Sequence, residues 1–240
     1  SGALIAVSAS FSCYALRNGL IRAIHRTSEA SVLLRGLGSD VADMRFCQGC
    51  ELIAAVSKAG VVLAWRLSVE GDAVEAEVVL SHTPASPPSD PASPCLALFV
   101  SSELLLAHSS GSGLQLFRLG SAEQAEPCAV AAADGVSAVG FSEGRDALIV
   151  GCASGEAYTC EDVVASSGSG RLGLMGMPFQ AHASAVALAA PCGRAMFVTG
   201  ATGGCEFKVW SGGAGDDDGD DDEPSCVFVL SLEPPPPSIH

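Results

Sequence analysis

Apolar residues in this chain come in short runs, and polar turns that contain glycine separate them. In residues 51–68, the apolar run 52–56 precedes a Ser-Lys-Ala-Gly turn, and a second apolar run ends at Trp65. Short apolar runs between turn signals predict β-strands. Since these runs do not alternate between apolar and polar residues, we expect strands that are buried on both faces.

The same arrangement of three strands recurs at a fixed spacing. In three places, the apolar residue that begins the first strand precedes the end of the third strand by 24 residues. The pairs are Val41 with Trp65, Val136 with Cys160, and Val186 with Trp210. A turn glycine stands five or six residues before the later position in each case, at Gly60, Gly155 and Gly204. We call this later position the Trp position.

Two weaker units extend the repeat and place further Trp positions at Ile24 and Phe117. Neighbouring Trp positions are then 41 to 52 residues apart, a period typical of four-stranded propeller blades. We therefore predict an all-β fold, a β-propeller of degenerate WD-type blades. The predicted blades cover residues 1–36, 37–82, 93–130, 131–165 and 179–232, and a Pro-rich tail covers 233–240.

The blades depart from the usual WD repeat at its polar positions. WD repeats carry Asp after the Trp and another Asp in the preceding turn, whereas here Lys58 stands in the turn and Arg66 follows Trp65. Ser211 follows Trp210, and only His182 stands near the His position of a WD block. We therefore expect a broken polar network and blades held together mainly by apolar stacking.

Composition and charge exclude several classes of function. Hydrophobic residues make up 48% of the 240, enough for a sizeable core, but no apolar run is long enough to span a bilayer. Residues 1–66 hold seven Lys or Arg against four acids, and residues 67–240 hold five against 23. Such an acidic chain is not expected to bind nucleic acid, because phosphate contacts need clustered cations. No secretory signal is visible, and we expect a segment of a longer protein.

The ten cysteines are scattered along strand-like segments, which favours reduced thiols over a disulfide framework. Cys47 and Cys50 form one CxxC pair. A structural zinc site needs two more ligands, and no second CxxC or HxxxH follows, so we expect no metal. The simpler interpretation is two small residues at the end of a strand and its turn.

Sequence motifs for catalysis are absent or incomplete. GSGRLG at 168–173 has the glycines of a dinucleotide loop but lacks a following helix, and Val209 replaces the hydroxyl residue that a phosphate loop needs after Lys208. The acidic run 216–223 lacks the glycine of a calcium loop. We expect neither an enzyme nor a cofactor, and mobile loops at 83–94, 165–178 and 213–224.

An ordered set of short blocks resembles the Varicose family, the enhancer-of-mRNA-decapping scaffolds. The blocks are IAV, CYAL, G-IR-I, LLRG and V-DM-F within residues 4–46, followed by LIAAVSKAGVVLAWRL, FVTGATGGCEFKVWS and CVFVLSLE. The resemblance is strong over residues 4–67 and 195–232 and poor between about 70 and 180. Family members carry a seven-bladed N-terminal propeller, a Ser-rich linker and a helical C-terminal scaffold, so this chain would supply about five blades of the seven.

The resemblance implies a non-catalytic interaction module of a cytoplasmic scaffold in processing bodies, which brings decapping factors together and promotes removal of the 5′ cap. Its expected partners are proteins of the decapping complex, without direct sequence-specific nucleic-acid binding and without a membrane. Oligomerisation is expected through regions outside this segment. The alternative is a WD-repeat adaptor of another pathway, such as a ubiquitin ligase or a chromatin reader, because propellers serve many functions.

Four arginines of the first predicted blade are the candidate binding residues: Arg17, Arg22, Arg26 and Arg35. They form a basic region in an otherwise acidic chain and are suited to bidentate contacts with carboxylates of a partner. The alternative is that their long side chains cover neighbouring apolar surface and keep the blade soluble.

Overall fold

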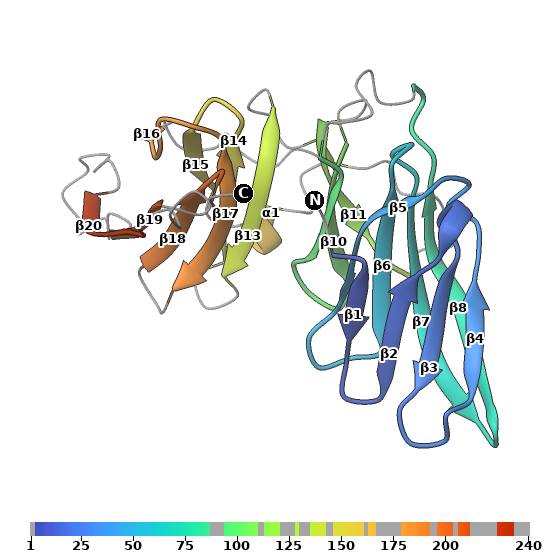
Figure 1. Cartoon of the computed structure of the whole chain (residues 1–240). Coiled ribbons are helices and arrows are strands. Elements are labelled where there is room, and N and C mark those ends of the chain that lie inside the picture. The colour runs from blue at the N-terminus through green and yellow to red at the C-terminus, as the bar shows by residue number, and fades with distance from the viewer. Residues whose placement is uncertain are drawn as a thin grey trace, which may run out of the picture. The chain divides into compact units, whose positions relative to one another are not determined.

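The computed structural model describes residues 3–86, 94–109, 113–120, 128–129, 135–142, 146–160, 163–166, 179–192, 196–203, 206–211 and 225–232. The all-β prediction is confirmed, because these residues form 20 strands and only two short helical segments (Figure 1). The helical segments are the 3-10 turn η1 (Arg17–Gly19) and the four-residue α1 (Val163–Ser166). The loops predicted to be mobile lie largely outside the described residues, as does the Pro-rich tail.

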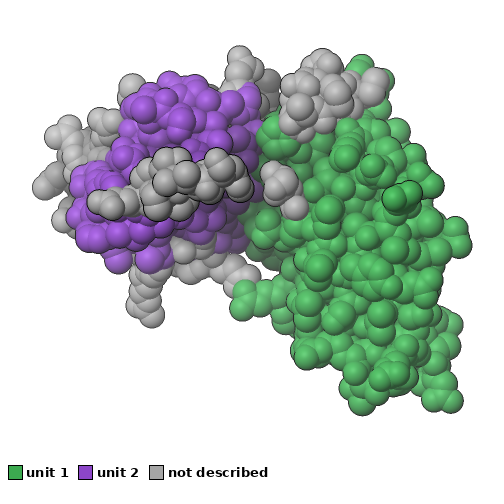
Figure 2. Space-filling model, viewed as in Figure 1, with its two compact units in different colours: residues 1–132, 166–172 green, residues 133–165, 173–240 purple. Residues whose placement is uncertain are grey.

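The strands form five separate four-stranded antiparallel sheets, each built from four consecutive strands. The chain divides into two compact units, shown in green and purple in Figure 2. The first unit contains three sheets. Their strands are β1 (Ile5–Val7), β2 (Phe11–Ala15), β3 (Ile21–His25) and β4 (Ser31–Leu34); β5 (Val41–Phe46), β6 (Leu52–Ser57), β7 (Val62–Glu70) and β8 (Ala73–His82); and β9 (Leu96–Phe99), β10 (Leu104–Ser109), β11 (Gly113–Arg118) and β12 (Cys128–Ala129).

The second unit contains two sheets. Their strands are β13 (Val136–Ser142), β14 (Ala147–Cys152), β15 (Glu156–Cys160) and β16 (Phe179–Gln180); and β17 (Val186–Cys192), β18 (Met196–Ala201), β19 (Glu206–Ser211) and β20 (Ser225–Ser231). Within each unit the first strands of successive sheets pack side by side, β1 with β5 and β5 with β9 in one, and β13 with β17 in the other. We call the five sheets the first to fifth blades.

The second strand of most blades is buried on both faces, as its unbroken apolar run predicts. All six residues of β6 are buried, and so are all six of β10 and of β14. β6 belongs to the second blade, which has a blade on each side within its unit, so a further sheet covers each of its faces. The stack, rather than the single blade, is therefore the unit that removes apolar surface from water.

The five Trp positions lie on the third strands, and all have the same register. Each one pairs with the second residue of the second strand in its blade. The pairs are Ile24 with Ser12, Trp65 with Ile53, Phe117 with Leu105, Cys160 with Leu148, and Trp210 with Phe197. All but Ile24 are buried.

The Trp position faces the blade that precedes it within its unit. Trp65 packs in one cluster with Phe11, Ile21 and Ala23 of the first blade. Phe117 contacts His82, the last residue of the second blade, with 5.0 Å between ring centroids. The side chains of Trp65 and Phe117 therefore each cover part of the preceding blade.

One blade boundary differs from the sequence prediction. The fourth blade was expected to end at residue 165 and the fifth to begin at 179. Instead, Phe179 and Gln180 form the fourth strand of the fourth blade, because they pair with Ala157 and Glu156. Phe179 is fixed there by the Trp210 ring, which it meets edge-on at 4.8 Å. Two residues are too few to give a periodic signal in the sequence.

The turn glycine before the Trp position has a conformational reason. Gly19 and Gly155 have φ angles of 71° and 88°, which side chains rarely adopt. A Cβ on Gly19 would also clash with the carbonyl oxygen of Ser39, in the segment that leads to the second blade. The glycine lets the turn pack closely against the entrance to the following blade. Gly204, the glycine expected in the fifth blade, lies outside the described residues.

A buried carboxylate joins the three blades of the first unit. Asp43 lies in β5 with no exposed surface. Its Oδ1 accepts a hydrogen bond from the backbone N–H of Ala3 at 2.6 Å, just before β1, and its Oδ2 accepts one from Ala97 of β9 at 3.0 Å. Arg45 lies 3.6 Å from Oδ2 and balances part of the charge. One side chain thus satisfies backbone donors from the blades on both sides.

We expect Asp43→Ala to lower the free energy of unfolding by about 3 kcal/mol, because two backbone donors lose a charged acceptor. Asp43→Asn keeps a carbonyl oxygen and should lose about half as much. Asp72→Ala, an exposed position in the β7–β8 turn, is the matched control and should stay within about 0.5 kcal/mol of the wild type. Denaturant unfolding measures all three, and an Asp43→Ala variant as stable as the control would contradict this role.

Candidate interaction surface

The first blade presents an uncovered face in the described residues. Two rows of paired side chains make this first-blade face: Ile5, Tyr14, Arg22 and Leu33 in one, and Val7, Ser12 and Ile24 in the other. Ile5 is 69% exposed, Val7 57% and Tyr14 36%. Ile24, the Trp position of the first blade, lies on this face. In the later blades of this unit the Trp position packs against the preceding blade, whereas within this unit no blade precedes the first. The first-blade face is therefore uncovered, and it combines exposed apolar side chains with Arg22.

The opposite face of the same blade is fully covered. Ala6, Phe11, Cys13 and Ile21 pack with Trp65 and are almost without exposed surface. Burial there raises the pKa of the Cys13 thiol to about 12, with the Glu51 carboxylate adding to the effect. The contrast between the two faces marks the exposed one as a surface on which another protein can pack.

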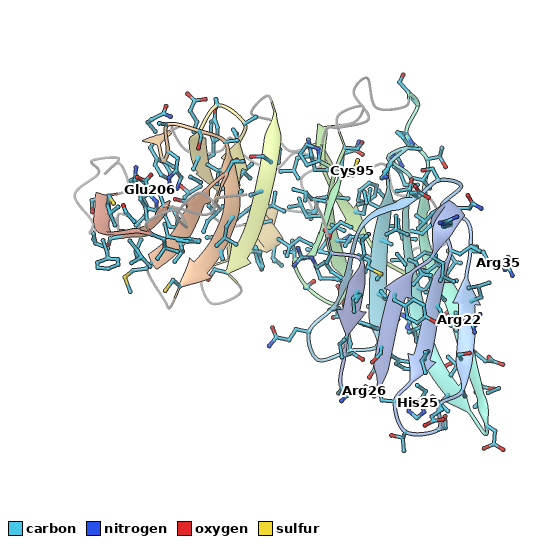
Figure 3. The ribbon with its side chains drawn as sticks, in the orientation of Figure 1. Arg22, His25, Arg26, Arg35, Cys95 and Glu206 are labelled. Atoms are coloured by element: carbon cyan, nitrogen blue, oxygen red, sulfur yellow. The ribbon has the colours of Figure 1, made fainter. Side chains whose placement is uncertain are left out.

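Three of the four candidate arginines lie toward one end of the blade. Arg17 is in the exposed η1 turn, Arg22 is half-buried on the first-blade face, and Arg35 follows β4 directly and is exposed. Figure 3 shows Arg22 and Arg35 on the same blade, and Arg22 pairs with Leu33, two residues before Arg35. Within the described residues, none of the three forms an ion pair.

Arg26 is separate from this group. It lies at the far end of the blade, beside His25 in Figure 3. Its Nη1 donates to the carbonyl oxygens of Ser8 and Ala9, at 3.1 Å each. Arg26 therefore closes the turn between β1 and β2, and its guanidinium is already engaged. The expected set of four divides into a group of three and one structural residue.

The fifth blade contradicts the prediction of a broken polar network. The Trp210 indole N–H donates to Thr199 Oγ1 at 2.8 Å, and the same hydroxyl lies 2.8 Å from His182 Nε2. His182 Nδ1 lies 2.7 Å from Glu206 Oε1. Because the ionised carboxylate can only accept, Nδ1 carries the proton that goes to Glu206. In the neutral ring Nε2 is then an acceptor, so the Thr199 hydroxyl accepts from the indole and donates to Nε2. A continuous chain of four side chains thus links β19, β18 and the segment before β17.

The missing carboxylate comes from an unexpected place. WD repeats take it from Asp in the turn, whereas here Glu206 supplies it from the first position of β19. His182 was a visible signal in the sequence, but a search for Asp in the turn misses Glu206.

Charge around Glu206 stabilises its ionised form. The hydrogen bond with His182 lowers the pKa of the Glu206 carboxyl, burial opposes this, and Lys208 at 3.4 Å lowers it further. The stability that this group contributes is therefore present above the ordinary carboxyl pKa and is lost as the pH falls through the lowered value. Because Glu206 is 38% exposed, solvent screens much of the effect.

Other titratable groups do not form a reactive site in the described part of the chain. Burial lowers the pKa of His82 and of His108, which favours neutral imidazoles. Among the described residues, no group of three or more His, Cys, Asp or Glu side chains could hold a metal ion. No helix within them is long and apolar enough to cross a membrane.

Comparison with known proteins identifies the fold. No family model and no curated protein sequence matches this chain. A chain in the crystal structure of the mitotic checkpoint complex aligns with 96% of this chain and 66% of its own length, at 13% identity and a TM-score of 0.68. The C-terminal WD40 domain of Sif2 aligns with 93% of this chain and 55% of its own, at 13% identity and a TM-score of 0.66.

The WD40 domain of Toxoplasma gondii coronin gives 95% and 58% coverage, 12% identity and a TM-score of 0.68. This chain therefore has the fold of WD40 β-propeller domains. It spans 66%, 55% and 58% of the three chains' lengths. The prediction of degenerate WD-type blades is confirmed at the level of the fold.

We expect Thr199→Val to lower the free energy of unfolding by about 2 to 4 kcal/mol, because the buried Trp210 and His182 nitrogens both lose their partner. Thr199→Ser keeps the hydroxyl and removes one methyl group, so it should cost about 1 kcal/mol. Denaturant unfolding of both variants separates the hydroxyl from the volume of the side chain. Equal losses would show that packing alone holds this blade.

Proposed function

We propose that this chain is a non-catalytic protein-interaction module of a cytoplasmic mRNA-decapping scaffold. It would bring decapping factors together in processing bodies and so promote removal of the 5′ cap. One observation carries the proposal: blocks that resemble the Varicose family converge on the first-blade face. Ile5 belongs to IAV, Tyr14 to CYAL and Arg22 to G-IR-I, and the three side chains form one row across the sheet.

The remaining residues of these blocks support the fold of this region. Gly19 allows the close turn before β3, and Asp43, from V-DM-F, joins the three blades of the first unit. Arg35, from LLRG, directly follows β4 of the same sheet (Figure 3). The blocks therefore contain two kinds of residue: some stabilise the fold of the blade, and others are exposed on its surface. Packing alone gives no reason for the exposed residues.

The chemistry of the face indicates the kind of partner. Ile5, Val7 and Tyr14 offer apolar surface, while Arg22, in the row with Tyr14, and Arg35, directly after β4, offer guanidinium groups. Such a surface suits a segment that carries both apolar side chains and carboxylates. Aromatic and arginine side chains are also the residues that most often dominate the binding energy of interfaces. We infer an acidic, partly apolar segment of a decapping-complex protein as the ligand.

The test is the double variant Arg22→Glu with Arg35→Glu. We expect its affinity for a decapping-complex partner to fall at least about tenfold, because attraction to carboxylates becomes repulsion. Co-precipitation from cytoplasm followed by mass spectrometry identifies the partner, and titration at low and high salt measures the affinity. Fluorescent fusions report recruitment to processing bodies, and circular dichroism checks the fold.

Arg66→Glu is the matched control, because Arg66 is exposed on the second blade and away from the first-blade face. It should bind like the wild type. If the double variant also binds like the wild type, the face is not the binding site. Capture of ubiquitin-ligase or chromatin proteins in place of decapping factors would support the alternative adaptor and contradict the decapping role.

A further inference from the structure

A cavity of about 470 Å³ lies at one end of the first two blades. Residues 7–9, at the end of β1 and in the turn after it, form one wall, and residues 46–51, at the end of β5 and in the turn after it, form the other. The second wall contains both cysteines of the CxxC pair. Cys47 is buried and Cys50 is half-buried, and both are reduced thiols. The pair therefore borders a space that small molecules in solvent can enter.

The turn between the two cysteines brings them close together. Gln48 and Gly49 are its central residues, and Gly49 has a φ of 76°, the value that a type II turn needs at this position. The end residues of a β-turn have Cα atoms less than about 7 Å apart, and disulfides join Cα atoms about 4.4 to 6.8 Å apart. Two thiols at positions one and four of such a turn are within reach of each other.

Hydrogen bonds hold both ends of this turn in place. The Cys47 N–H donates to the Leu52 carbonyl at 2.9 Å, and the Leu67 N–H donates to the Glu51 carbonyl at 2.8 Å. The Ser8 hydroxyl donates to the Glu51 carboxylate at 2.9 Å and so links the turn to the first blade. The backbone on either side of the cysteines is therefore fixed before any bond forms between them.

We propose that Cys47 and Cys50 are a dithiol site that a low-molecular-weight disulfide such as glutathione disulfide oxidises to an intrachain disulfide. This inference goes beyond the proposed function and does not depend on it. Cys50 is the more exposed thiol and reacts first, while Cys47 resolves the intermediate. Metal binding is the less suitable chemistry here, because the described residues offer no further ligands of the kind zinc requires.

The exchange balances in two steps. The Cys50 thiol gives its proton to water, and its thiolate attacks one sulfur of glutathione disulfide; the S–S bond breaks, and one glutathione thiolate leaves and takes up a proton. Cys47 gives its proton to water, and its thiolate attacks the Cys50 sulfur of the mixed disulfide. The Cys50–glutathione bond breaks, and the second glutathione thiolate leaves and takes up a proton. The protein has lost two hydrogen atoms with their electrons, and one glutathione disulfide has become two glutathione molecules.

Trypsin isolates the site for mass spectrometry. Cleavage after Arg45 and Lys58 releases residues 46–58, in which Cys47 and Cys50 are the only cysteines. After incubation of the folded chain with glutathione disulfide, we expect this peptide to lack two hydrogen atoms and to regain them with dithiothreitol. Cys13 is the internal control: it is 1% exposed and should keep its free thiol in the folded protein.

Comparing oxidation of the folded chain with that of the urea-unfolded chain distinguishes a pre-formed site from two cysteines that are merely close in sequence. We expect the equilibrium constant for oxidation to be about tenfold larger in the folded chain, equivalent to about 30 mV. In Cys47→Ser, the mixed disulfide with glutathione should accumulate on Cys50. In Cys50→Ser, Cys47 should take up severalfold less glutathione, because it is buried. Equal constants in the two states, or two free thiols after oxidation of the folded chain, would overturn the proposal.

Discussion

The second blade of this protein is a sheet with two apolar faces, and exposing either face to water would be unfavourable. β6, which is buried at all six positions, shows the consequence: its blade lies between two other sheets. The Trp position meets this need by placing a large side chain against the preceding blade. Close stacking then brings backbone donors of the first strands together, and Asp43 satisfies two of them at once.

The same constraint explains where binding can occur. Where a neighbouring blade packs on a face, that face is not available to a partner. On the first-blade face, Ile5, Val7 and Tyr14 are exposed. Arg22 and Arg35 add attraction for carboxylates to a surface that already favours apolar contact. The CxxC turn lies between β5 and β6, outside the stacked strands, and borders a cavity at one end of the first two blades.

The periodic features of the chain could be predicted from the sequence, because stacking requires buried apolar residues at equivalent strand positions of successive blades. Trp65 and Trp210 indeed lie in one register on third strands. Features that depend on a single long-range contact could not be predicted. Glu206 replaces an expected Asp, and Phe179 forms a strand only because Ala157 and Trp210 hold it.

The sequence also could not separate the four arginines, because spacing along the chain does not reveal hydrogen-bond partners. Arg26 looks like its neighbours in the sequence, yet two carbonyl oxygens of the β1–β2 turn engage it. Asp43 poses the same difficulty, since its two backbone partners are 40 and 54 residues away. Its position in an apolar strand signals a buried acid, but only the fold shows what it binds.

Native-state hydrogen exchange tests the central claim, that mutual covering of blade faces holds this chain together. Amides of β6, which is buried at every position, should exchange most slowly and should open only with global unfolding. Amides of β20, which is exposed at every described position, should exchange fastest among the strands, and those of β1 should also be fast. Equal protection of β20 and β6 would contradict the claim, because protection would then not depend on the covering of faces.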